Sequence, residues 1–157
     1  MPSPRSDQSR AVDESPERVR LLRLASELGV AGDMEMTGHL AADELERALA
    51  GAWVQAAPSF AEQFGLSAVE AAMRGTATVA SRVGGLPEVV RDGRTGFLFT
   101  AGDHEALAAR LVALLRDRGR AERMGREARA DALARFSMSA CAERFERLYE
   151  RVRAARN

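Results

Sequence analysis

The chain has 157 residues, which fits one domain with a sizeable core or one half of a two-domain protein. Its 23 basic residues balance 23 acidic ones, so the net charge gives no reason to expect a nucleic-acid or anionic-membrane partner. Every basic residue is arginine, which excludes phosphate binding or Schiff-base chemistry by lysine.

The remaining composition narrows the class of protein further. Cys141 is the only cysteine, which excludes internal disulfides and cysteine-based zinc sites, and we expect it to be a small core residue. No apolar run approaches the ~20 residues of a membrane span, and the N-terminus has no signal-peptide core. We therefore expect a cytoplasmic protein without a transmembrane segment.

The predicted elements alternate along the chain after a polar lead-in. Residues 1–14 are polar and read as disordered, and Ser15-Pro16-Glu17 then begins a helix that ends at Gly29. The segments expected to be strands are 33–37, 52–59, 76–81 and 96–99. Short helices are expected at 43–50 and 66–74, and three longer helices follow Asp103. Their apolar stripes are interpreted as core packing, the last one containing Cys141, Phe145, Leu148 and Val152.

This order predicts an α/β fold: a partial Rossmann-like parallel sheet of about four strands, with flanking helices and a three-helix C-terminal tail. In such sheets ligands bind beyond the carboxyl ends of the strands. The loops expected to matter are therefore 38–42, 58–66 and 81–88.

The middle loop carries two glutamates, Glu62 and Glu70, on either side of Gly65. Glycine allows a backbone conformation that a side chain would forbid, and the N–H groups of Phe64, Gly65 and Leu66, expected to be free at the start of the following helix, form a natural seat for a phosphate. Glu70 lies one turn into that helix, where its carboxylate could accept hydrogen bonds from a diol such as ribose. Glu62 could face sugar hydroxyls from the other side.

A simpler interpretation of the same stretch is helix capping. Ser59 with Glu62, and Ser67 with Glu70, both have the spacing of a capping box. Spacing alone favours this interpretation, because such short matches arise often by chance.

The stretch EQFGLSAVEAAMRGTATVASRVGGLPEVVRDGRTGFLF resembles the signature region of family-4 retaining glycosyltransferases, with its Glu-x7-Glu motif, Gly-Gly loop and P-E-V-V segment. The similarity runs from about Ser15 to Tyr149. It implies the C-terminal, nucleotide-sugar-binding half of a GT-B fold, made of two Rossmann-like domains across a cleft. The sugar would pass from the nucleotide donor to an acceptor hydroxyl with retention, without a cofactor.

The resemblance also implies roles for individual residues. Glu62 would be the catalytic residue that contacts the donor sugar, and Glu70 would hold the ribose. The donor-binding backbone between them is Gln63, Phe64, Gly65 and Leu66. The residues implied to contact the base or line the cleft are Gly38, His39, Leu40, Gly84 and Gly85.

The chain departs from the family pattern at the diphosphate. Family members hold it with an arginine and a lysine after the first strand of this domain, but this chain has no lysine and begins downstream of that strand. Arg82, Arg91 and Arg94 are candidate substitutes, with Arg82 best placed, although a solvated arginine is the better interpretation. The absence of a D-x-D sequence gives no sign of a metal ion.

The departures lead to three hypotheses. The first is that residues 15–157 form an incomplete donor-binding domain, truncated at its N-terminus, that acts only with a missing N-terminal domain or a separate chain. The second is a non-catalytic module that binds a nucleotide sugar or a partner protein. A sugar-nucleotide epimerase is less favoured, because the extra catalytic acids it needs cannot be placed. Without the first two strands of the domain, 33–37 would lack its usual neighbour, so Met34 and Met36 should be held less firmly than Val79 or Leu98.

Overall fold

The computed structural model describes residues 15–155, so the predicted disordered lead-in, 1–14, lies outside the described residues. The chain divides into two compact units, Met1–Leu45 and Glu46–Asn157, and each is described by itself. None of the helices in the described part of the chain is long and apolar enough to cross a membrane.

The first unit begins with helix α1 (Pro16–Glu27), which starts where the sequence predicted. The hydroxyl of Ser15 accepts a hydrogen bond from Arg18 N at 3.3 Å, and Gly29 follows the helix with a φ of +71°. A short 3₁₀ turn, η1 (Ala31–Asp33), comes next. Helix α2 (Ala42–Gly51) begins in this unit and ends in the second.

The strand predicted at 33–37 does not form. Met34 has extended dihedral angles, φ −116° and ψ 126°, but residues 34–38 belong to no strand. The alternation of DMEMT therefore sets the local conformation, but no strand in the described chain pairs with it, and the Met36 carbonyl accepts a hydrogen bond from the Arg18 side chain instead, at 3.1 Å. The expectation of about four strands is corrected to three for residues 15–155.

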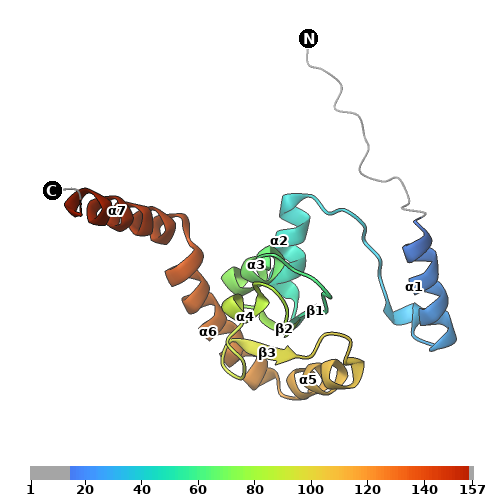
Figure 1. Cartoon of the computed structure of the whole chain (residues 1–157). Coiled ribbons are helices and arrows are strands. Elements are labelled where there is room, and N and C mark those ends of the chain that lie inside the picture. The colour runs from blue at the N-terminus through green and yellow to red at the C-terminus, as the bar shows by residue number, and fades with distance from the viewer. Residues whose placement is uncertain (1–14, 156–157) are drawn as a thin grey trace, which may run out of the picture. The chain divides into compact units, whose positions relative to one another are not determined.

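The second unit is built on a parallel sheet of strands β1 (Val54–Ala57), β2 (Ala77–Ser81) and β3 (Gly96–Phe99), in that order (Figure 1). Val54 pairs with Ala77, and Thr78 pairs with Gly96. All residues of β2 and β3 are buried, as expected for parallel strands covered on both faces. Within the described residues, β1 has no second neighbour, so one of its edges is unpaired.

Helices cover both faces of this sheet. Helices α3 (Leu66–Arg74) and α4 (Leu86–Val89) pack on one face, where Ala80 and Leu98 point. Helices α5 (His104–Arg116) and α6 (Arg118–Phe136) pack on the other face, against Val79, Phe97 and Phe99. The predicted α/β architecture is confirmed.

One close backbone contact lets helix α6 pack against both the sheet and helix α3. It passes the amino end of β2, where a Cβ on Gly125 would collide with the carbonyl oxygen of Gly75. It then runs beside α3, with Ala128 and Ala132 packed against Ala72. Its C-terminal end thereby arrives at the carboxyl edge of the sheet, beside the start of α3.

The last helix, α7 (Met138–Ala154), corrects one prediction. Ser137 caps it by accepting a hydrogen bond from Ala140 N at 3.2 Å, but none of its residues is buried. Phe145 and Tyr149 stack on each other, with ring centroids 6.4 Å apart, on an otherwise uncovered stripe. Cys141 is exposed and not a core residue, because nothing in the described chain packs on this stripe.

Candidate functional site at the carboxyl edge of the sheet

The bend between β1 and α3 depends on glycine, as the sequence predicted. Gly65 is the N-cap of α3 and has a φ of +92°, a conformation that L side chains rarely adopt. A Cβ there would also stand 2.9 Å from a methyl carbon of Leu86. Both the backbone conformation and the space therefore require glycine at this position.

The carboxylate of Glu62 lies on the amides of this bend. Its Oε1 accepts hydrogen bonds from Gly65 N at 3.1 Å and from Phe64 N at 3.3 Å. The prediction that these two amides are free is therefore wrong. The capping-box alternative with Ser59 is also not formed, because Glu62 instead caps the bend that follows it.

Glu70 remains available for a ligand. The second capping box does not form, since the N-cap of α3 is Gly65 and Ser67 lies inside the helix. Among the described residues, the half-buried side chain of Glu70 has no hydrogen-bond or ion-pair partner. At the start of α3, the amides of Leu66 and Ser67 precede the first intrahelical acceptor and have no partner in the described chain.

The Gly84-Gly85 loop packs directly on the bend. Gly85 N donates to the carbonyl oxygen of Glu62 at 3.3 Å, and a Cβ on Gly84 would collide with that same oxygen. A Cβ on Gly85 would stand 2.6 Å from the carbonyl oxygen of Phe64. The two glycines therefore let the loops after β1 and β2 touch backbone to backbone.

Ser81, at the end of β2, also holds this bend in place, and the sequence reasoning did not predict its role. Its hydroxyl is fully buried and donates to the carbonyl oxygen of Ser59 at 2.5 Å, with that of Ala57 at 3.3 Å. A serine at the last position of the strand predicted at 76–81 was the available signal. It fixes the point where the chain leaves β1.

Arg82, the predicted phosphate residue, is paired with an acid. Its guanidinium lies 2.8 Å from Asp92 Oδ2, and its side chain is 55% exposed. Asp92 is held in turn because its Oδ1 accepts from Leu98 N at 3.0 Å. A phosphate at Arg82 would therefore have to share or replace this carboxylate.

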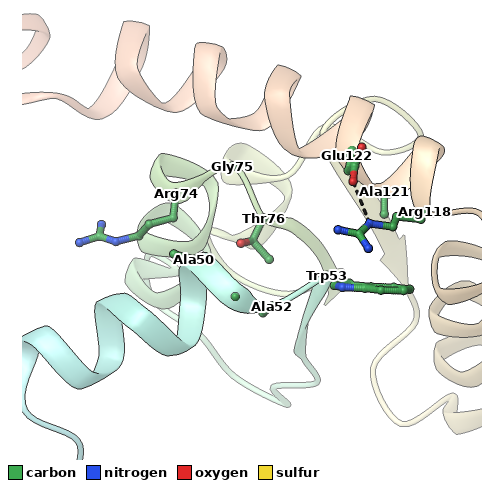
Figure 2. Close-up of a pocket in the computed structure, with 10 residues that line it drawn as sticks. Ala50, Ala52, Trp53, Arg74, Gly75, Thr76, Arg118, Ala121 and Glu122 are labelled. Atoms are coloured by element: carbon green, nitrogen blue, oxygen red, sulfur yellow. Dashed lines mark hydrogen bonds and ion pairs between the residues drawn. The ribbon is translucent and has the colours of Figure 1, made fainter.

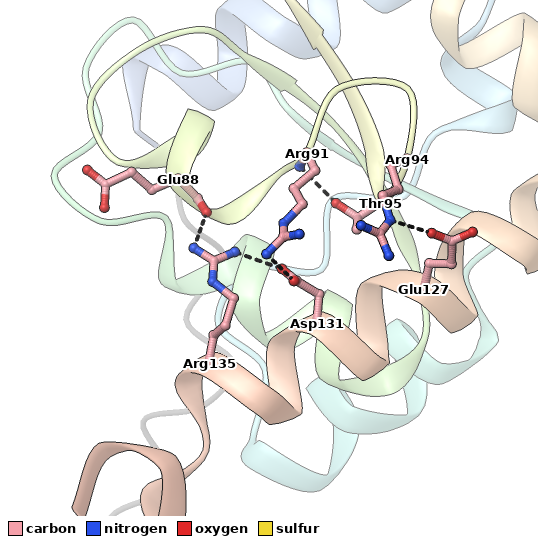
Figure 3. A network of polar contacts seen from close by, with 7 residues as sticks. All are labelled: Glu88, Arg91, Arg94, Thr95, Glu127, Asp131 and Arg135. Atoms are coloured by element: carbon pink, nitrogen blue, oxygen red, sulfur yellow. Dashed lines mark hydrogen bonds and ion pairs between the residues drawn. The ribbon is translucent and has the colours of Figure 1, made fainter. Parts of the chain in front are cut away.

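Acidic and arginine side chains connect the C-terminal half of α6 to α4 and to the loop between α4 and β3 (Figure 3). Asp131, 15% exposed, contacts both Arg91 and Arg135 at 2.7 Å. Arg135 also donates to the carbonyl oxygen of Glu88 at 2.6 Å, while the Glu88 side chain points away from the helix. The spacing of Asp131 and Arg135, four residues apart on one helix, was a signal that the sequence reasoning did not use.

Two further contacts connect α6 to neighbouring loops. The ring of Phe136 meets that of Phe64 edge to face, with centroids 5.7 Å apart. Arg94 pairs with Glu127 at 2.8 Å, and this hydrogen bond raises the pKa of the Arg94 guanidinium. All three candidate phosphate arginines are thus engaged with acids.

The remaining predicted contacts lie in the first unit. Gly38 has a φ of +66° with no atom that a Cβ would meet, His39 is exposed, and Leu40 is half-buried. The chain bends at His39, inside the loop predicted at 38–42. A role of these residues in binding the base stays a prediction.

A groove of about 320 Å³ lies at the opposite, amino edge of the sheet (Figure 2). Trp53 forms part of its lining, and the guanidinium of Arg118 lies 4.7 Å from the centre of the Trp53 ring while pairing with Glu122 at 2.9 Å. No candidate site residue lines this groove. It is therefore separate from the site at the carboxyl edge.

Comparison with known proteins shows the family to which the chain belongs. The family model described as "Glycosyl transferases group 1" matches residues 10–131. The chain belongs to the group 1 glycosyl transferase family. A D-inositol 3-phosphate glycosyltransferase of Nocardia farcinica is 42% identical over 123 residues, which are 78% of this chain and 27% of that protein. An MMP alpha-(1->4)-mannosyltransferase of Mycolicibacterium hassiacum is 39% identical, over 83% of this chain and 32% of that protein.

Similar solved structures agree with the fold. A sucrose-phosphate synthase from Thermosynechococcus elongatus superposes with a TM-score of 0.80 at 33% identity, over 96% of this chain and 37% of that one. The Anabaena protein HepE, solved in complex with UDP-glucose, superposes with a TM-score of 0.77 at 25% identity, over 88% of this chain and 38% of that one. This group 1 chain thus spans about a third of the length of the relatives it matches.

Proposed function

We propose that the carboxyl edge of this sheet is the donor site of a family-4 retaining glycosyltransferase, which transfers a sugar from a nucleoside-diphosphate sugar to an acceptor hydroxyl. One observation carries the proposal: in a group 1 glycosyl transferase, the bend between Glu62 and Glu70 enters α3 through a left-handed glycine, with exposed residues on both sides of it. A similar solved structure was determined with UDP-glucose.

The donor would meet backbone and carboxylates in turn. The N-terminus of α3 carries partial positive charge, and the unpartnered amides of Leu66 and Ser67 could receive phosphate oxygens there. Glu70, half-buried and unpaired within the described chain, would accept hydrogen bonds from the ribose hydroxyls. Glu62 would contact the sugar, with the backbone of Gln63 to Leu66 between the two acids.

The departing diphosphate needs positive charge, because its stabilisation is often the largest catalytic contribution. Arg82 is the best-placed cation, since it follows the carboxyl end of β2. It would exchange its ion pair with Asp92 for the phosphate, which is feasible because both side chains are partly exposed. Arg91 and Arg94 are better explained by their contacts with α6.

The acceptor would be bound by protein beyond this chain. Residues 15–157 would supply the donor side, and an N-terminal domain or a separate polypeptide would supply the acceptor side and the remaining diphosphate contacts. Catalysis would then require both parts. We also keep the cytoplasmic location as part of this proposal.

The test is calorimetry with a panel of nucleoside-diphosphate sugars. We expect one of them to bind the 157-residue chain, and Glu70→Ala to weaken that binding at least about tenfold through loss of the ribose contacts, which corresponds to about 1.4 kcal/mol. The matched control is Glu105→Ala, an exposed acid on α5. Nucleotide affinity that is unchanged by Glu70→Ala, together with no sugar transfer after an acceptor domain is supplied, would refute the proposal.

A non-catalytic module is the second candidate. It is favoured by the ion pairs that occupy all three candidate phosphate arginines and by the uncovered apolar stripe of α7. In its partner-binding form, such a module would bind a partner protein and no nucleotide sugar. The same calorimetric panel separates the two candidates.

A further inference from the structure

The side chain of Glu62 occupies two amides of the backbone proposed to bind the donor. Its Oε1 is hydrogen-bonded to Phe64 N and Gly65 N at 3.3 and 3.1 Å. A carboxylate oxygen and a phosphate oxygen are both anionic acceptors, so they compete for the same N–H groups. The inference that follows rests on the proposed function, because it concerns how the same bend receives a donor.

The backbone on the first side of this bend cannot move aside to admit a donor. The carbonyl oxygen of Glu62 accepts from Gly85 N and lies where any Cβ on Gly84 would be. The carbonyl of Ser59, three residues earlier in the chain, is held by the buried hydroxyl of Ser81. The chain leading into the bend is therefore fixed by backbone contacts.

The other side of the bend is equally constrained. The Phe64 ring packs edge to face on Phe136, and Gly65 lies against Leu86. The two amides thus keep their direction. Within the part of the chain that the structure describes, the polar contacts of the Glu62 side chain are its two hydrogen bonds to the bend, and such a side chain can change rotamer within nanoseconds.

The geometry points to Glu62 as an internal stand-in for the donor diphosphate. In the empty protein its carboxylate satisfies the Phe64 and Gly65 amides and keeps the bend in its binding conformation. An incoming diphosphate displaces the carboxylate from these amides. The freed side chain turns to the sugar side of the bend.

This exchange would also select donor over product. A bare nucleoside diphosphate displaces Glu62 without offering it new hydrogen-bond donors, and it leaves an anionic carboxylate beside anionic phosphates. A nucleotide sugar presents hydroxyl groups that can donate to the displaced carboxylate. Glu62 should therefore oppose binding of the product nucleotide more than binding of the donor.

The experiment compares the wild-type chain with Glu62→Gln, a neutral variant of the same shape. UDP, GDP and ADP and their glucose esters are titrated by calorimetry, and the nucleotide that binds the wild type is used. We expect Glu62→Gln to tighten the bare diphosphate about tenfold, or about 1.4 kcal/mol, and to change the sugar ester by less than about threefold. Glu88→Gln is the control, because it removes one charge from a side chain that points away from α6 (Figure 3) and should leave both affinities unchanged.

A second measurement follows Glu62 directly in the wild-type chain. Its carboxyl ¹³C resonance should shift when the bare diphosphate binds, while that of Glu88 stays in place. Equal affinity of the wild type and Glu62→Gln for the bare diphosphate, or weaker binding by the variant, would overturn the exchange while leaving the donor site intact. If the wild type and Glu62→Gln bind none of the nucleotides, the proposed function is refuted and the exchange with it.

Discussion

The segments 33–40 and 52–66 differ sharply, although the sequence predicts a strand followed by a loop in each. The first takes up extended dihedral angles at Met34, but it has no strand partner in the described chain and is mostly exposed. The second is held by backbone contacts from Gly85 and by the hydroxyl of Ser81. Alternation of side chains sets a local conformation, whereas a defined site needs neighbouring backbone to hold it.

The glycines of the two segments show the same difference. Gly38 and Gly84 both have positive φ, of +66° and +49°. A Cβ on Gly38 would meet nothing within 4 Å, but one on Gly84 would collide with the Glu62 carbonyl. Glycine therefore permits a turn in the first segment and permits a contact between two loops in the second.

The largest expected difference is in amide hydrogen exchange, between strand β2 and the segment 33–37. The β2 amides at Val79 and Ala80 should exchange only through near-global unfolding, which costs about 5 kcal/mol or more in a typical domain. The amides of Met34 and Met36 should exchange with little protection. Similar protection of 33–37 and 76–81 would contradict the absence of a strand in the first unit.

The contact between the two loops can be broken by one methyl group. Gly84→Ala should lower the free energy of unfolding by about 3 kcal/mol, from backbone strain at positive φ and overlap with Glu62. Gly93→Ala is the matched control, since Gly93 also has a positive φ, of +76°, but open space around it. It should cost only about 1 kcal/mol of strain. Urea denaturation measures both, and equal losses would show that the loop contact does not stabilise the fold.

A smaller loss of stability is expected from breaking the ion pairs between α6 and the loop before β3. Asp131→Asn should lower the free energy of unfolding by about 1–2 kcal/mol, because a mostly buried acid loses its charge between Arg91 and Arg135. Glu127→Gln breaks an exposed pair on the same helix, and its effect should lie within the error of the measurement. A control variant as destabilised as Asp131→Asn would argue against a special role for the buried acid.

Much of the fold could be predicted because its signals are local. The start at Ser15-Pro16, the glycine before Leu66 and the strand Gly96–Phe99 all depend on neighbouring residues, and the structure contains each of them. The prediction of a strand at 33–37 was wrong, because strand pairing depends on residues that lie far away in the sequence. Burial of the α7 stripe was wrong for the same reason: helical spacing shows an apolar face but not what covers it.

The candidate site was predictable only in outline. The motif picked out Glu62, Gly65 and Glu70, and the left-handed glycine is present. Spacing could not show that Glu62 turns onto the amides of Phe64 and Gly65, because a side-chain rotamer is chosen by contacts in three dimensions. Nor could it show that Arg82 pairs with Asp92, ten residues further along the chain.

The most direct test is an amide NMR titration of the labelled 157-residue chain with the nucleotide sugar that binds in calorimetry. The donor site proposed at the carboxyl edge predicts the largest shift changes at Gly65, Leu66, Ser67 and Gly85. The amino-edge groove around Trp53 and Arg118 should stay unperturbed. Changes concentrated at that groove, with Gly65 to Ser67 unaffected, would contradict the account.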